Sequence, residues 1–181
     1  DDSTGQTFQR LANQPLWQHL RGLRLSDLEV DRGALATFLA SPDRRRVESL
    51  TLHAIGKQTG AMRSLFLGAR LDALTELRLL GLDLRKADVL ALAELPMAPQ
   101  LRVLDVSGNF LVASDIAHLL RPELFEGLET VVFGEAEVTA EELNAVTASL
   151  AHPSLRRLEF PHTAAAATLG HSAIDVESPA G

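Results

Sequence analysis

The stretch LRVLDVSGNFL, residues 101–111, has apolar residues at its first, fourth, sixth and eleventh positions and an asparagine, Asn109, at its ninth. This spacing fits neither a helix, whose apolar residues recur every three to four positions, nor a long alternating strand. The same pattern begins again at residues 20, 47, 74, 101, 128 and 155, so every step is 27 residues with no insertion. Self-similarity at one fixed period of this length indicates a stack of repeated supersecondary units.

The second half of each unit has the spacing of a helix. Position 16 is apolar in the five units that reach it, and the residues are Leu35, Met62, Val89, Ile116 and Leu143. Position 19 is apolar as well, with Phe38, Leu65, Leu92, Leu119 and Val146. Thr139 to Glu142 reads as a capping box, Ser114 is a candidate N-cap, and Pro42, Pro96 and Pro122 stand where the helices should end. Each unit is therefore predicted to be a short strand, a turn and a returning helix.

In unit length and helical return, residues 20–160 resemble the leucine-rich repeat family, and within it the ribonuclease-inhibitor-like subclass. The resemblance implies an α/β solenoid, a horseshoe segment with a parallel sheet on the concave side and helices on the convex side. Parallel strands do need a long crossover, usually a helix. The excess of arginine over lysine, 15 to 2, suggests a bacterial coding sequence.

The resemblance also implies that the ninth-position asparagine hydrogen-bonds the backbone of its turn. Asn109 fits this expectation. The other five repeat units, called rows below, carry Leu28, Ile55, Leu82, Ala136 and Thr163 at this position. We expect those turns to satisfy their backbone groups by other means, for example with water.

The two ends of the chain depart from the repeat. Residues 1–19 are predicted to be a capping helix or half repeat, with Phe8 and Leu11 at positions 16 and 19 and Trp17 covering the open end of the core. Residues 161–181 lack periodicity, with Gly170 where position 16 should be apolar, and are predicted to be a mobile or loosely docked tail. The edge near Leu158 would then be covered by the tail, by further repeats or by another chain.

The amino-acid composition argues against several classes of function. The chain has 181 residues, a net charge of −7, 46% hydrophobic and 23% charged residues, and no cysteine. The acidic balance argues against nucleic acid, and no apolar run is long enough for a membrane span. The runs Arg44–Arg46 and Arg156–Arg157 are predicted to be solvated turns and strand flanks. The histidines lack metal-ligand spacing and the glycines form no phosphate loop, so we expect no metal and no cofactor. The absence of cysteine favours the cytoplasm.

Positions 3, 5 and 7 of each strand should point away from the core, onto the concave face. Ser26 and His53 fall on neighbouring rows there, but the next row offers Leu80, so no carboxylate follows to orient the histidine. Charges and apolar residues mix elsewhere on this face, with Glu76 expected to balance Arg78. The candidate partner-binding residues are Arg24, Thr51, Arg78, Leu80, Val103, Asp105 and Val132.

The resemblance implies a non-catalytic scaffold that binds another protein on its concave face. An alternative is the recognition part of a larger enzyme or effector whose catalytic domain lies outside this chain, which the missing start methionine and truncated first unit would fit. A third possibility is self-association at the C-terminal edge. Fold alone does not establish function, so these readings stay open.

Overall fold

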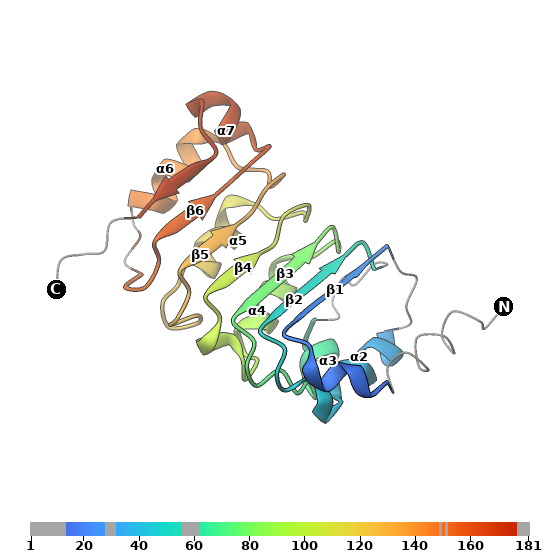
Figure 1. Cartoon of the computed structure of the whole chain (residues 1–181). Helices are drawn as coiled ribbons and strands as arrows, with labels where there is room; N and C mark the ends of the chain where they lie inside the picture. Colours follow the sequence, from blue (N-terminus) through green and yellow to red (C-terminus); the bar gives the residue numbers. More distant parts are fainter. Residues whose placement is uncertain (1–13, 28–31, 56–61, 149, 151, 177–181) are drawn as a thin grey trace.

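The computed structural model describes residues 14–27, 32–55, 62–148, 150 and 152–176. It contains a seven-stranded sheet whose strands lie in chain order, and Figure 1 shows them side by side. The first six strands are parallel, and the seventh pairs antiparallel with the sixth. The strands are β1 Gly22–Ser26, β2 Ser49–His53, β3 Glu76–Leu80, β4 Val103–Asp105, β5 Thr130–Val132, β6 Arg157–Glu159 and β7 Ala173–Asp175.

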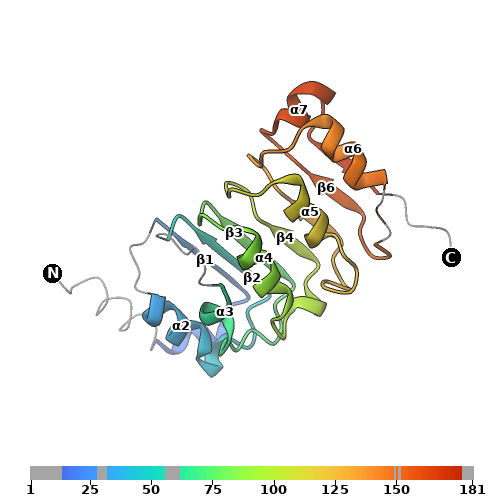
Figure 2. The same cartoon turned by 180° about the vertical axis from the view of Figure 1, so that it is seen from behind.

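Helices connect consecutive parallel strands and lie on one side of the sheet, as the views from front and behind show (Figures 1 and 2). The α-helices are α2 Arg32–Ala40, α3 Met62–Phe66, α4 Lys86–Ala93, α5 Ala113–Leu119, α6 Ala140–Ala148 and α7 Ala164–Leu169. Three short 3₁₀ helices are η1 Pro15–His19, η2 Pro42–Arg44 and η3 Ala98–Gln100. The prediction of an α/β fold with a mostly parallel sheet is confirmed. The side of the sheet opposite the helices is called the open face below.

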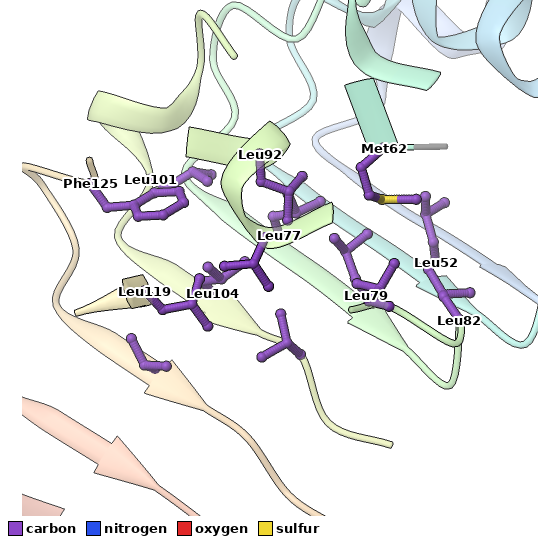
Figure 3. Close-up of a cluster of buried hydrophobic side chains, with 14 of the residues drawn as sticks. Leu52, Met62, Leu77, Leu79, Leu82, Leu92, Leu101, Leu104, Leu119 and Phe125 are labelled. Atoms are coloured by element: carbon purple, nitrogen blue, oxygen red, sulfur yellow. The ribbon is translucent and has the colours of Figure 1, made fainter. Parts of the chain in front are cut away.

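The strand register follows the sequence period. Each residue of a parallel strand pairs with the residue 27 positions later, as in Leu23 with Leu50 and Leu77 with Leu104. Leu104 is fully buried, as predicted, and Leu101, Val106 and Leu111 of the same row are buried with it. Figure 3 shows leucines of neighbouring rows packed against helix residues such as Leu92 and Leu119. One continuous core therefore runs between the sheet and the helices.

The helix boundaries follow local signals, with one correction. Thr139 and Glu142 form the predicted capping box at the start of α6, with Thr139 N donating to Glu142 Oε2 at 2.9 Å and Glu142 N to Thr139 Oγ1 at 3.3 Å. Ser114 is not the N-cap of α5, because the helix already includes it, and the Val112 N–H donates to the Asp115 carboxylate at 3.3 Å. Asp115 therefore satisfies the backbone N–H of the N-cap residue Val112 from the first turn of the helix.

Each of the six parallel strands is followed by a residue in the left-handed region at the same position of its row. Position 8 has positive φ in all six rows, at Asp27, Ala54, Gly81, Gly108, Glu135 and His162. In the first five rows its N–H donates to the carbonyl at position 7 of the next row, over 2.9 to 3.1 Å, as from Asp27 to His53. In each of these turns, the hydrogen bond between rows satisfies the N–H of position 8 whether or not the row carries an asparagine.

Asn109 secures the one turn where the asparagine is present, as predicted. Its Oδ1 accepts from the N–H groups of Leu82 and Leu84, both at 3.0 Å, and its Nδ2 donates to the carbonyls of Leu79 and Val106, both at 2.7 Å. One side chain therefore joins its own turn to the turn of the preceding row, whose own ninth residue is Leu82.

At the N-terminal end, an aromatic cluster covers the core. Trp17 contacts the Phe38 ring edge-on with ring centroids 5.2 Å apart, in agreement with the predicted covering role. Arg44 contradicts the prediction of a solvated basic turn. It is fully buried, with its guanidinium carbon 4.0 Å from the Phe38 centroid and 4.9 Å from that of Trp17. The predictions for Phe8 and Leu11 lie outside the described residues.

The described part of the C-terminal segment, residues 161–176, contains a helix and a strand in place of the predicted mobile or loosely docked tail. Thr163 accepts a hydrogen bond from Ala166 N and caps α7, and Gly170 ends the helix in the left-handed region at φ 74°. The chain then reverses into β7, which pairs with the edge of β6. Phe160 is fully buried and stacks on Phe133, with ring centroids 6.0 Å apart. The first of the three expected arrangements is observed, since the chain covers this edge itself.

Candidate interaction surface on the open face

The candidate site is a row of side chains that runs across the open face. Register pairing joins the fifth positions of consecutive strands in the order Arg24, Thr51, Arg78, Asp105, Val132 and Glu159. Neighbouring parallel strands lie about 4.8 Å apart, so adjacent members of this row are in contact range. Leu80 and Val103 flank the row at positions 7 and 3 of β3 and β4. The structure thus brings the predicted residues to one surface.

Arg78 has carboxylates on two sides, as predicted. Its guanidinium nitrogens lie 3.6 Å from Glu76 Oε2 and 3.7 Å from Asp105 Oδ2. Both distances exceed a hydrogen bond, and Arg78 donates none to the residues that the structure describes. The side chain is 39% exposed. Its charge is therefore balanced locally, while its N–H donors stay available to a group above the sheet.

Asp105 is held in place by Ser107, two residues further along the same row. It is 8% exposed and accepts from Ser107 N at 3.0 Å and Ser107 Oγ at 2.7 Å. The same Ser107 Oγ accepts from Gly134 N at 2.9 Å. A Cβ added to Gly134 would lie 3.0 Å from that oxygen, so glycine permits this approach. The sequence analysis missed this role of Ser107 and Gly134, because it depends on a contact between rows.

Charged residues at the C-terminal end of the open face are also paired. Arg157 Nε lies 2.7 Å from Glu159 and its Nη1 lies 2.8 Å from Asp175 on β7. These hydrogen bonds raise the pKa of Arg157, with the Glu159 bond contributing most. The donors that face these two carboxylates are therefore occupied, unlike those of Arg78.

The N-terminal end of the row differs from the C-terminal end in the pairing of its polar side chains. Arg24 is exposed and forms no ion pair with any residue within the described ranges. Thr51 is 8% exposed, and its hydroxyl has no hydrogen-bond partner in the part of the chain that the structure describes. Register places Thr51 directly between Arg24 and Arg78. Three groups with unused hydrogen-bonding capacity are thus adjacent.

The expected apolar centre is smaller than predicted. Val132 is 9% exposed, so it does not face water as expected. It lies in register between Asp105 and Glu159, and it alternates along the chain with the core residues Val131 and Phe133. Leu80 and Val103 are half-buried and keep accessible surface. They form the apolar part of the site.

Ser26 and His53 are register neighbours, as predicted. No hydrogen bond joins them, and Leu80 follows His53 in the next strand. A nucleophile and base need a hydrogen bond and an orienting third group. Within the described residues, no three histidine or acidic side chains gather as metal ligands, and no helix has the length and hydropathy to cross a membrane.

Comparison with known proteins adds no family. No protein-family model matches the sequence, and no curated protein is significantly similar to it. The class that the structure defines is therefore an α/β protein with a mostly parallel sheet, one face of which carries helices.

Proposed function

We propose that this chain is a leucine-rich repeat protein of the ribonuclease-inhibitor-like subclass, of bacterial origin, with residues 20–160 forming a horseshoe solenoid segment. The uninterrupted 27-residue register of the parallel strands supports the proposal. The contacts of Asn109 support it too, because they are those that the resemblance implied. In this proposal the helix α7 and the strand β7 close the C-terminal end of the stack.

We propose that its function is non-catalytic, as a cytoplasmic scaffold that binds another protein on the open, concave face. The observation that carries this proposal is the asymmetry of the sheet. Helices cover one side, while the other side presents unused donors on Arg24 and Arg78 beside the half-buried Leu80 and Val103. Interfaces concentrate their energy in a few central apolar and arginine residues, which matches this composition.

Other partner classes fit less well. A net charge of −7 opposes nucleic acid. Self-association through β6 is less favoured, because β7 already pairs with the edge of β6. A protein partner needs no large basic field and can use both the apolar and the charged groups of the open face.

The test is capture of a partner from the source cells with the immobilised chain, comparing Val103→Asp with a matched control. The control is Leu90→Asp, because Leu90 is 38% exposed and lies on α4, on the helical side. Loss of a hot spot costs at least about 2 kcal/mol, so Val103→Asp should weaken binding by more than about tenfold. Leu90→Asp should leave binding unchanged.

Circular dichroism and thermal unfolding establish that both variants are folded. Loss of binding in Leu90→Asp with retention in Val103→Asp would move the interface to the helices and refute the proposal.

A further inference from the structure

The adjacent side chains of Arg24, Thr51 and Arg78 have the chemistry of an anion-binding site. Thr51 is nine-tenths buried, yet its hydroxyl has no hydrogen-bond partner among the described residues. The hydroxyl is not one of the fully buried polar atoms without a partner, so it is available to donate a hydrogen bond to a ligand above the sheet. Arginine on the strand to either side can donate to the same ligand from above.

We infer that the open face binds a carboxylate side chain of the partner protein over Thr51, between Arg24 and Arg78. The inference rests on the proposed function and names the chemistry that the partner must offer. Guanidinium groups bind carboxylates through paired N–H donors, and such charge-assisted bonds are about twice as strong as neutral ones.

Local charge selects a single carboxylate over a phosphate or a polyanion. Glu76 and Asp105 lie 3.6 and 3.7 Å from Arg78, so the two arginines are already offset by two carboxylates. A monoanion close to Arg24 and Thr51 can be accommodated there. A dianion would meet stronger repulsion from the same two acidic groups, on a chain whose net charge is already −7.

The apolar residues fix a second feature of the partner. Leu80 lies one strand away from Thr51 and two residues further along, and Val103 lies two strands away and two residues back. With strands about 4.8 Å apart and a rise of about 3.3 Å per residue, Leu80 is roughly 8 Å and Val103 roughly 12 Å from Thr51. An extended segment spans these distances in about three to four residues. The partner segment should therefore carry an acidic residue, with an apolar residue three or four positions away.

The experiment is selection of a random displayed peptide library on the intact chain, followed by affinity measurements on the enriched peptides. The wild-type chain should enrich peptides with an acidic residue and an apolar residue at this spacing. Arg24→Gln, Thr51→Val and the acid-to-amide change in the peptide should each weaken binding by about tenfold, the loss expected for a charged hydrogen bond. Arg63→Gln is the matched control, because Arg63 is exposed on α3, on the helical side, and pairs with Glu94.

A variant of opposite sign sharpens the test. Glu76→Gln removes a carboxylate that competes for Arg78, while the amide oxygen can still accept from Ser49 Oγ. It should tighten binding of the acidic peptide, whereas general damage to the surface would weaken it.

The outcomes separate this inference from the proposed function. If enriched peptides lose affinity for Val103→Asp but not for Arg24→Gln, the open face is the binding surface, and the proposed carboxylate-binding site over Thr51 is refuted. If peptides lack acidic residues, or if none is enriched, the inference is overturned. If binding ignores both Val103→Asp and Arg24→Gln, both proposals fail.

Discussion

Replacing Asn109 with alanine should be among the most destabilising single changes in this chain. Asn109 is 4% exposed and accepts hydrogen bonds from Leu82 N and Leu84 N at 3.0 Å. Alanine would leave both N–H groups buried without this acceptor, and each such group costs about 1–3 kcal/mol, or about 2–6 kcal/mol together. The carbonyls of Leu79 and Val106 would lose a donor as well. Domains of this size have about 5–15 kcal/mol of stability, so the loss is a large fraction of the total.

The free energy of unfolding can be measured by urea denaturation followed by circular dichroism, with Phe110→Ala as the matched control. Phe110 is the next residue in the same turn but is 62% exposed, and its truncation should cost no more than about 0.5 kcal/mol. Hydrogen exchange gives a local readout, since the amides of Leu82 and Leu84 should lose protection first. Equal stability losses for the two variants, or unchanged protection of those amides, would refute the assigned role of Asn109.

The repeat period predicted the backbone well because its apolar positions report burial directly. Leu77 and Leu104 stand in register one unit apart, and both are fully buried. The geometry of the turns was harder to predict from the sequence, since five of the six rows lack asparagine at position 9. The position-8 N–H of each of the first five rows is hydrogen-bonded to a carbonyl of the next row, and such backbone contacts carry no residue signature.

The burial of Arg44 follows its position in the repeat unit and not its charge. Arg44 shares its position in the unit with Leu71, Ala98 and Phe125, which are all buried, yet its charge predicted a solvated turn. Two aromatic rings near the end of the stack make its burial possible. Predicting this burial requires knowing which side chains of neighbouring rows contact one another.

The two other errors have local causes. Gly170 was interpreted as the failure of a repeat helix, whereas it ends α7 and allows the chain to turn back. The alanine-rich segment before it has good helix propensity, which a template based on leucine spacing does not detect. Val132 alternates with the core residues Val131 and Phe133, as expected on the open face, yet it is only 9% exposed, which alternation along one strand does not reveal.

Three further predictions test the core and the contacts between rows. Leu104→Ala should lower the free energy of unfolding by about 2–5 kcal/mol in urea denaturation, because Leu104 is fully buried, and an unchanged midpoint would contradict the register. Gly134→Ala should cost about 1–3 kcal/mol, because its Cβ would lie 3.0 Å from neighbouring atoms, whereas Gly22→Ala, with nothing within 4 Å, should cost nothing by the same measurement. The third concerns His152, which is 1% exposed and whose pKa is lowered by burial, partly opposed by a hydrogen bond to the Phe125 carbonyl. Because the unfolded chain then binds the proton more readily, stability should be fully present above the unfolded pKa of about 6.5 and should fall as the pH drops below it. His152→Phe, which copies the residue one unit earlier, should flatten the dependence of the urea midpoint on pH in that range, and an equally steep dependence in this variant would show that another group is responsible.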